Sequence, residues 1–455
     1  MTHQRSKCSF ALGLHYAPGY AERCQQALEE ALYCTPAYGA WLKCDPGPEY
    51  PVFSRLAALP ALTKADLRAH GPQGFAPHGR DVAAALRTGE IQLVATSGTT
   101  SDQVMNIWHQ AWWNASEAAS WQLNAHAQRA ANGMQREAIL TSPYCAGFPC
   151  EEGYLPVEQR RLDRFLFLSE RSDPSTWTGA LMDRMVAELN DFGPSILEAN
   201  PSFLARLARH IVASKLRVHT PELVVLTYEN PSLLHYRQIR RAFACPIASS
   251  YGSTEAGYVF MECEAGRLHQ VTASCHVDFL PLKREHGGPD IGAILVTTFG
   301  NPWRSLLRFD IADLVRLAPT SCPCGRREGL TLASIEGRAA NLTLTPEGRA
   351  VTQARVDRAL SNAAGLAEYQ LVQTGPAAYQ VHFVPDGPAE PVAGAIRTAL
   401  QGVYGPQAAI TAWPVPAIAP APPGKYRRTR AAWPIPVDAL LESDYAPAAL
   451  EEGHT

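Results

Sequence analysis

The chain has 455 residues, of which 46% are hydrophobic and 18% charged, a composition typical of a globular protein of roughly two to four domains. Its 36 prolines and 33 glycines exclude a coiled coil and a collagen-like rod. The net charge is only −3, so no global field attracts the chain to nucleic acid or to an acidic membrane.

The chain contains no apolar stretch long enough to span a membrane, and residues 1–18 lack the apolar region of an export signal. We therefore expect a cytoplasmic protein with neither a membrane nor a nucleic acid as partner. Its 11 cysteines form an odd, scattered set, which argues against a disulfide framework. Most are expected to be free thiols, but Cys322 and Cys324 are close enough to suggest a joint role.

The first ninety or so residues are predicted to be helical. Apolar residues recur at helical spacing over Tyr20–Cys34, and Thr63 caps a second helix over Thr63–Leu67. A short apolar strand follows at Ile91–Thr96 and leads into a loop of small residues. One long helix is then predicted over Ala111–Ala131.

Strands and helices alternate through the next part of the chain, which predicts an α/β sheet with helices on its faces. Ligands of such sheets usually bind beyond the carboxyl ends of the strands. The predicted strands are Ala138–Thr141, Arg164–Leu168, Ser195–Ala199, Leu223–Tyr228, Pro246–Tyr251 and Ala293–Thr298. The predicted helices are Trp177–Asn190, Ser202–Ala213 and Ser232–Phe243.

After about residue 337 the pattern indicates a separate small α+β domain, so we divide the chain into residues 1–336 and 337–455. Its predicted elements are strands at Leu342–Leu344, Glu368–Thr374 and Tyr379–Pro385 and helices at Val356–Ala364 and Pro391–Gly402. The proline-rich stretch Pro414–Pro436 forbids a regular helix or a central strand, yet it carries the basic cluster Lys425–Arg430.

Several common catalytic motifs are missing from the sequence. There is no P-loop, no G-x-G-x-x-G dinucleotide turn, no H-E-x-x-H zinc-protease helix and no G-x-S-x-G nucleophile elbow. The absence of these motifs removes the usual evidence for four large enzyme classes.

Two small-residue loops follow predicted strands. Thr96–Ser101 offers consecutive backbone N–H groups and hydroxyls that could cradle a phosphate, although such clusters are more often plain surface turns. Ser249–Glu255 combines an aromatic ring, a glycine and a carboxylate that could hold Mg²⁺. Its alternative interpretation is a strand end with a helix cap.

In this order and spacing, these loops resemble the adenylate-forming superfamily, and in detail its phenylacetate-coenzyme A ligase branch. The resemblance covers most of the chain. It is carried by the following segments: Phe53–Leu67, Thr96–Thr100, Asn200–Phe203, Tyr228–Pro231, Tyr251–Glu255, Leu307–Leu314, Glu336–Ala339 and Pro423–Lys425. It implies a large N-terminal α/β adenylation domain and a small, mobile C-terminal α+β domain.

The resemblance also implies the residues of a nucleotide site. Lys425 would reach the α-phosphate, Glu255 would hold magnesium, Tyr251 would pack near adenine and Asp313 would accept hydrogen bonds from the ribose. The full set of implied nucleotide-binding residues is Ser97, Gly98, Thr99, Thr100, Glu229, Tyr251, Gly252, Thr254, Asp313 and Arg338. Magnesium and one movable lysine can neutralise the anions as a carboxylate attacks ATP and pyrophosphate leaves.

Three positions depart from the family pattern. Ser101–Gln103 replaces the usual Gly-Lys-Pro of the phosphate loop and so removes a cation. The hinge has Ala340 and Asn341 in place of two aspartates, and Tyr228 stands before Glu229 where the family prefers a small residue. These departures predict weaker handling of pyrophosphate, altered domain rotation and a reshaped acyl pocket.

A set of cysteines and a histidine predicts a metal site. Cys263, His269, Cys322 and Cys324 can form a closed tetrahedral site for structural zinc, an ion that many members of that branch bind. Cys275 and His276 lie nearby in the sequence and are reserve ligands. The alternative is that Cys-Pro-Cys forms a reduced turn without metal.

Two aromatic groups are further candidates. Aromatic residues over Trp108–Trp113 could form a binding wall, but their helical spacing favours the core. Tyr144, Gly147 and Phe148 follow a strand at the expected ligand edge and are assigned to the acyl pocket.

The expected activity is the ATP- and Mg²⁺-dependent conversion of a carboxylic acid, expected to be aromatic, into an acyl-adenylate, followed by transfer to a thiol. Coenzyme A is the acceptor that the resemblance implies. A phosphopantetheine arm on an acyl carrier protein, or an amine, stays open, because the sequence contains no recognisable acceptor motif. Arg427, Arg428 and Arg430 could contact either a phosphorylated cofactor or an acidic carrier surface, so they do not discriminate. A non-catalytic nucleotide-binding protein is the remaining alternative, and the resemblance suggests a homodimer.

Overall fold

The computed structural model describes residues 14–96, 104–131, 135–143, 155–169, 171–421 and 425–442. The N-terminal part is helical, as predicted, with α1 (Tyr20–Cys34), α2 (Val52–Ala58), α3 (Lys64–Gly74) and α4 (Val82–Thr88). Thr63 caps α3 in a capping box with Asp66, whose backbone N–H donates to Thr63 Oγ1 and whose carboxylate accepts from the Thr63 N–H at 2.8 Å. The Thr63 cap prediction is confirmed.

The long helix predicted over residues 111–131 is wrong in one respect: it is two helices, α5 (Gln110–Trp121) and α6 (Ala125–Ala131). Asn124 separates them, because its side-chain oxygen accepts from the N–H groups of His126 and Ala127 at 2.9 and 3.0 Å and so starts a new helix. The same side chain donates to the carbonyl of Glu262 at 2.8 Å, which ties this break to the sheet.

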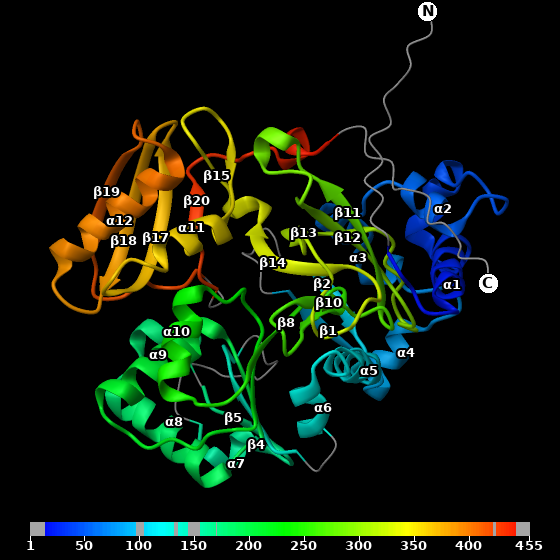
Figure 1. The fold of residues 1–455 in the computed structure, drawn as a ribbon. Helices are drawn as coiled ribbons and strands as arrows, with labels where there is room; N and C mark the ends of the chain where they lie inside the picture. The colour runs from blue at the N-terminus through cyan, green and yellow to red at the C-terminus, as the bar shows by residue number, and fades with distance from the viewer. Residues whose placement is uncertain are drawn as a thin grey trace, which may run out of the picture.

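A 12-stranded sheet forms the centre of the molecule, in the order β11-β12-β13-β14-β10-β9-β8-β7-β6-β3-β5-β4 (Figure 1). Its parallel half confirms the strands predicted from alternation. These strands are β3 (Glu137–Leu140), β5 (Phe165–Phe167), β6 (Ile196–Ala199), β7 (Leu223–Leu226) and β8 (Ile247–Ser253). A short helix, α7 (Val157–Arg160), leads into the edge strand β4 (Arg161–Leu162).

The antiparallel half of the sheet was mostly missed, because only its β12 was predicted. Its strands are β9 (Gly257–Glu262), β10 (Leu268–Gln270), β11 (Cys275–Pro281), β12 (Ile291–Thr298), β13 (Phe309–Leu317) and β14 (Thr331–Arg338). Polar residues such as His276 and Asp313 are buried in these strands, which hides the apolar runs that mark a strand in the sequence.

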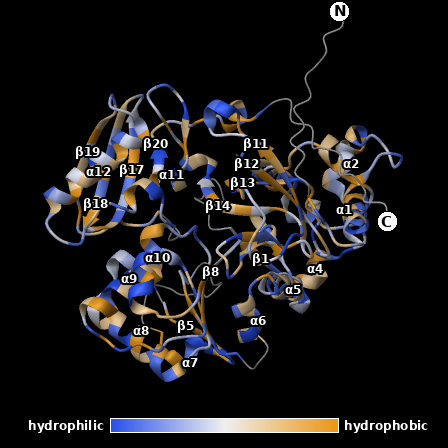
Figure 2. Ribbon diagram, viewed as in Figure 1, coloured by the Kyte–Doolittle hydropathy of each residue, from blue (hydrophilic) through white to orange (hydrophobic). Residues whose placement is uncertain are grey.

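Helices cover both faces of the parallel half. The helices α8 (Gly179–Phe192), α9 (Pro201–Ala213) and α10 (Leu233–Ala242) pack with Leu197 and Leu226 on one face. Residues of α5 and α6 pack with Ile196 and Val225 on the other. The strands are mostly orange and the helices mix blue and orange along their length, as amphipathic helices on a buried sheet do (Figure 2).

The C-terminal part is a smaller α+β unit, as predicted. Its sheet has the order β19-β18-β17-β20 and packs with two helices. The elements are β15 (Thr343–Leu344), β16 (Ala350–Val351), α11 (Gln353–Leu360), β17 (Leu366–Gly375), β18 (Ala378–Pro385), α12 (Ala389–Tyr404), β19 (Ala409–Pro414) and β20 (Thr429–Ala431). Within its described residues, the proline-rich stretch supplies the edge strand β20 and the last residue of the other edge strand, β19, which agrees with the exclusion of a central strand.

The fold class expected from the sequence is confirmed: a large N-terminal α/β part and a small C-terminal part, which lies over α9 and α10 (Figure 1). The division between residues 336 and 337 stays a prediction. Within the described residues, no helix has the length and apolar character that crossing a membrane requires.

Candidate functional site

Polar side chains gather where the parallel strands of the large sheet end. Asn200, directly after β6, accepts from the N–H groups of Ser202 and Phe203 at 2.9 and 3.3 Å and so starts α9. Ser202 Oγ then donates to Glu229 Oε1, after β7, at 2.9 Å. The second carboxylate oxygen of Glu229 and the buried hydroxyl of Ser250 have no hydrogen-bond partner. This edge therefore has spare buried hydrogen-bonding capacity, which a polar ligand could use.

The phosphate-loop residues Ser97, Gly98, Thr99 and Thr100 lie outside the described residues, but the hairpin that carries them is described. It consists of β1 (Gln92–Ala95) and β2 (Met105–Trp108), which confirms the predicted strand before the loop. Thr96 and Val104 close the base of the loop, with backbone and side-chain hydrogen bonds of 2.9 and 3.0 Å. The residues that flank the predicted phosphate loop, Thr96 and Val104, are therefore held together by hydrogen bonds.

Glu255, the expected magnesium ligand, is buried and lies 3.3 Å from the ammonium group of Lys64, at the start of α3. Burial opposes the charge of Glu255, but Lys64 and nearby hydrogen bonds outweigh burial and lower its pKa. The carboxylate is therefore ionised and able to hold a cation. In the sequence, Lys64 belongs only to the predicted helix over Thr63–Leu67, and no local pattern links it to a residue so distant in the chain.

A buried arginine joins Glu255 to the phosphate-loop hairpin. Arg304 donates to the backbone carbonyl of Glu255 and to the side-chain oxygen of Asn106 in β2. It also donates to the carbonyl of Thr254, a predicted nucleotide-binding residue, at 3.4 Å. Burial lowers the pKa of Arg304 to about 10, against the opposing effect of Glu255, so the guanidinium stays charged near neutral pH.

Three of the predicted nucleotide-binding residues meet at the junction of β8, β13 and β14. Tyr251 donates from its hydroxyl to Asp313 Oδ2 at 2.8 Å, and Arg338 Nε lies 3.8 Å from Asp313 Oδ1. Arg338 and Asp313 are register partners on β14 and β13. Next to them, Gly252 leaves no room for a side chain, because a Cβ there would lie 2.1 Å from the carbonyl oxygen of Gly257. The predicted set Tyr251, Gly252, Asp313 and Arg338 is thus one cluster.

Lys425, the predicted catalytic lysine, is close enough to Glu229 for its charge to act on that carboxyl group. Burial raises the pKa of Glu229. The positive charges of Arg428 and Lys425 act in the opposite direction but do not outweigh burial. The backbone of Lys425 pairs with Ala421 through hydrogen bonds of 2.9 and 3.0 Å, which closes the turn that carries it. The two residues predicted as catalytic therefore have different charged neighbours, since the ion-pair partner of Glu255 is Lys64.

The acyl-pocket candidates Tyr144, Gly147 and Phe148 lie outside the described residues. The structure instead shows an acidic network near Tyr228 that the sequence analysis missed. The hydroxyl of Tyr228 donates to Glu198 in β6, and burial together with Glu117 raises the pKa of Glu198 to about 8. Glu198 therefore carries a proton near neutral pH. The sequence did contain one indication of this network, because Glu198 is a charged residue type inside the otherwise apolar strand Ile196–Ala199.

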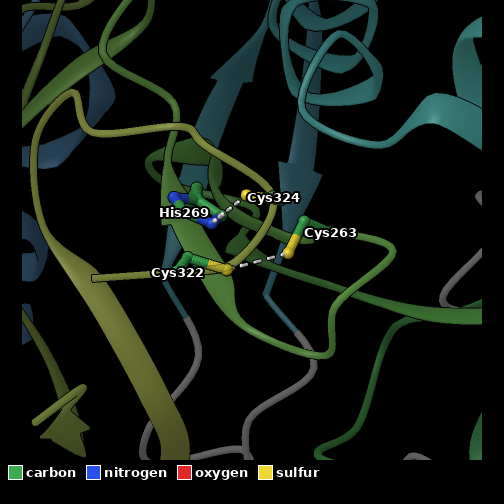
Figure 3. A group of neighbouring side chains, drawn as sticks. All are labelled: Cys263, His269, Cys322 and Cys324. Atoms are coloured by element: carbon green, nitrogen blue, oxygen red, sulfur yellow. Dashed lines mark hydrogen bonds between the residues drawn. The ribbon is translucent and has the colours of Figure 1, made fainter. Parts of the chain in front are cut away.

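The four predicted metal ligands come together (Figure 3). The ligand atoms of Cys263, His269, Cys322 and Cys324 all lie within 4.8 Å of one another. The Cys263 and Cys322 sulfurs are 3.6 Å apart, and Cys324 Sγ lies 3.3 Å from His269 Nε2. This Cys₃His set fits the tetrahedral preference of zinc.

The surroundings of His269 suit a metal ligand. Thr331 Oγ1 lies 3.3 Å from His269 Nδ1, an outer contact that fixes the ring while Nε2 faces Cys324. Burial is the main cause that lowers the pKa of His269 to about 4, so the imidazole is neutral, as metal binding requires. The cluster also joins β9 and β10 to the loop between β13 and β14.

The reserve ligands Cys275 and His276 are not part of this group. The carbonyl of Cys275 and Nδ1 of His276 both contact the hydroxyl of Tyr20, at 3.3 and 3.0 Å, and His276 Nε2 lies 3.5 Å from Asp278. These strand residues contact Tyr20 of α1 instead of the metal cluster, and three strands separate β11 from β10 in the sheet.

The aromatic residues over 108–113 divide between core and partly exposed positions. Trp112 is buried and donates from its indole nitrogen to the carbonyl of Phe299 at 2.9 Å. Trp113 is partly buried between Trp108 and Tyr258, with ring centroids 4.2 and 5.1 Å away. The preference for a packing role is confirmed for Trp112.

No protein-family model matches the chain. A segment of 176 residues is 26% identical to the protein CapK of Staphylococcus aureus, and it covers 38% of this chain and 38% of CapK. The matched segment is thus well under two thirds of CapK.

The structure matches crystal structures of 2-hydroxyisobutyryl-CoA ligase over nearly its whole length. In the postadenylation state with R3-HIB-AMP, that ligase covers 90% of this chain, the alignment covers 88% of the ligase, the identity is 17% and the TM-score is 0.67. In the thioesterification state with 2-HIB-AMP and CoA, the values are 91%, 89%, 18% and 0.53. The chain therefore has the fold of this acyl-CoA ligase.

Proposed function

We propose that the protein is an AMP-forming acid–thiol ligase of the phenylacetate-coenzyme A ligase branch. It activates a carboxylic acid, by resemblance an aromatic one, and transfers the acyl group to a thiol, with coenzyme A as the acceptor. The observation that carries the proposal is the cluster of Tyr251, Asp313 and Arg338 at the ligand edge of a sheet whose fold matches an acyl-CoA ligase.

The first half-reaction needs two anions to meet. A carboxylate oxygen of the acid attacks the α-phosphorus of ATP, the bond to the bridging oxygen breaks, and pyrophosphate leaves. Asp313 holds the ribose hydroxyls, Tyr251 packs near adenine, and the ammonium group of Lys425 stabilises the charge that develops at the α-phosphate. Glu255, which is ionised and buried, would hold Mg²⁺, an ion that neutralises phosphate oxygens when bound.

In the second half-reaction, the thiol sulfur attacks the acyl carbon of the adenylate, AMP leaves with the electrons of the broken C–O bond, and the thiol proton is released. We further propose that the two domains divide between residues 336 and 337. Support comes from Gly337, whose φ of 106° few other residues adopt, directly after Glu336. The Cys₃His cluster would bind structural zinc, since four protein ligands leave no open position for catalysis.

Mass spectrometry of a reaction with ATP, Mg²⁺ and pooled aromatic and short aliphatic acids, with and without coenzyme A, tests this function. We expect AMP and an acyl-coenzyme A product, whose mass identifies the acid. Formation of an acyl-adenylate without a thioester would indicate that the acyl acceptor is a carrier protein or an amine instead of coenzyme A. AMP from none of the acids would contradict the ligase assignment and favour a nucleotide-binding protein without turnover.

Replacement of Lys64 by methionine should move the acid side of the pH–rate profile to higher pH. Without Lys64, burial prevails at Glu255 and raises its pKa, so less of the carboxylate is ionised at pH 5 to 6. Each unit by which this pKa exceeds the assay pH should reduce the ionised fraction about tenfold. The measurement is kcat/KM for MgATP between pH 5 and 8.5, with Lys64→Arg as the charge-conserving control; superimposable profiles for all three proteins would refute the coupling.

A further inference from the structure

Arg428 lies in the same segment as Lys425 but is anchored very differently. Its side chain is buried, with an exposed fraction of 5%, whereas its neighbours Arg427 and Arg430 are exposed. Its backbone belongs to the small sheet, because its carbonyl accepts the N–H of Leu371 in β17 at 2.7 Å. The residue is therefore fixed in the C-terminal part of the molecule.

The guanidinium group of Arg428 crosses to the large part. Its Nη2 donates to the backbone carbonyl of Asn230 at 2.6 Å, directly after Glu229 in the turn that follows β7. Asn230 in turn donates to the carbonyl of Ile335 at 3.4 Å, just before the proposed hinge. One arginine thus connects the Lys425 segment to the carboxylate turn and, through it, to β14.

A second contact holds the guanidinium from the other side. Nη1 lies 3.3 Å from Asp357 Oδ2 in α11, and Tyr369 donates to the other carboxylate oxygen of Asp357. Burial works against the charge of Arg428, but Asp357, Tyr369 and Glu229 outweigh it and raise its pKa. The group is therefore a permanently charged link between α11 and the Glu229–Asn230 turn.

This arginine differs from a purely structural one in the same protein. Arg160, equally buried, donates to the carbonyls of Leu155 and Phe167 and to both carboxylate oxygens of Glu188. Arg428 instead donates a hydrogen bond from Nη2 to Asn230, and its Nε and Nη1 atoms donate none. A stabilising arginine would be expected to use more of its five donors. The contact to Asn230 is therefore better explained by a role in positioning the segment that carries Lys425 than by a contribution to stability alone.

We propose that Arg428 is a positioning residue: it docks the segment that carries Lys425 onto the Glu229–Asn230 turn and so aims the lysine at the carboxyl edge of the sheet. This inference rests on the proposed function, in which Lys425 acts at the α-phosphate. A small cavity lined by Ser202, His235 and Arg428 lies beside this contact. A displacement of about 1 Å in such an alignment can cost about 100-fold in rate.

Kinetics of adenylate formation test the positioning role. Arg428→Ala should lower kcat of ATP–pyrophosphate exchange about 100-fold with little change in KM for the acid, and Arg428→Lys should recover about tenfold of that loss. Arg237→Ala is the matched control, because Arg237 also joins the two parts, through the carbonyls of Ser361 and Leu366 at 2.8 and 3.1 Å, but does not touch the Lys425 segment. Equal losses in the Arg428 and Arg237 variants would overturn the inference.

A double variant separates positioning from folding. Arg428→Ala leaves Asp357 as a buried carboxylate without its cation, which destabilises the protein. Adding Asp357→Asn removes that charge, so we expect the melting temperature to recover while kcat stays low. Recovery of both would show that Arg428 acts through stability only.

Hydrogen exchange gives a readout that does not depend on catalysis. Amides of residues 425–431 should exchange at least tenfold faster in Arg428→Ala than in the native protein, and no faster in Arg237→Ala. Unchanged exchange would overturn the docking role even in an inactive protein. Faster exchange together with the absence of AMP formation by the native protein would instead retain the docking contact and reject the proposed function.

Discussion

Replacing Lys425 by alanine is expected to slow adenylate formation about 100- to 1,000-fold, the usual cost of removing one group that stabilises charge in a transition state. The charge of Lys425 acts on Glu229, which follows β7 at the edge where the parallel strands end. Without it, the approach of a carboxylate to the α-phosphate is opposed by uncompensated negative charge. The measurement is ATP–pyrophosphate exchange with the acid identified by mass spectrometry.

Two further proteins make this result specific. Lys425→Arg keeps the charge and should retain more activity than alanine. Lys43→Ala removes an exposed lysine that is not among the predicted site residues, and it should have no effect. Thioester formation from supplied acyl-adenylate should survive in Lys425→Ala, since no phosphate is attacked in that step. Native exchange rates in Lys425→Ala would show that the proposed mechanism is wrong.

Removal of the metal from the Cys₃His cluster is expected to have the largest effect on stability. Cys322→Ser should lower the free energy of unfolding by about 4 kcal/mol or more, because loss of a metal ligand belongs to the most damaging class of substitution. The cluster joins β9 and β10 to the loop between β13 and β14, so its loss also loosens the strands that carry Asp313 and Arg338. Urea unfolding and elemental analysis of the purified protein give the two measurements.

The matched control is Cys34→Ser, which changes an exposed cysteine outside the cluster and should alter neither metal content nor stability. We expect about one zinc per chain in the native protein and in this control, and less than half of that in Cys322→Ser. A native protein purified without zinc, and insensitive to a chelator, would mean that Cys-Pro-Cys is a reduced turn.

Much of the fold followed from local patterns. The helix over Tyr20–Cys34, the Thr63 cap and the alternating strands of the parallel half are each encoded by spacing within a few residues. Local patterns predicted less where a polar side chain has a distant partner. Asn124 breaks the expected helix because it caps α6 and reaches Glu262 in β9, a contact that no short window of sequence contains.

The candidate site also contains residues that the sequence predicted and contacts that only the structure shows. Resemblance selected Tyr251, Asp313 and Arg338, and the spacing of cysteines selected the metal cluster, because these residue types occur in recognisable runs. No local sequence pattern predicts the ion pair between Lys64 and Glu255. The raised pKa of Glu198 likewise depends on its burial and on the nearby charge of Glu117. Ion pairing and pKa depend on distance and on exclusion of water, which are properties of packing.

The sequence alone therefore determined the fold class, the helices and parallel strands, and the residue types available for a nucleotide and a metal. Tertiary structure decided which of these residues meet. It selected His269 over His276 for the metal cluster, because β10 and β11 lie at different places in the sheet, and it placed Arg428 against Asn230 by folding the C-terminal part onto α9 and α10. Register and packing, unlike periodicity, bring together residues that are far apart in the chain.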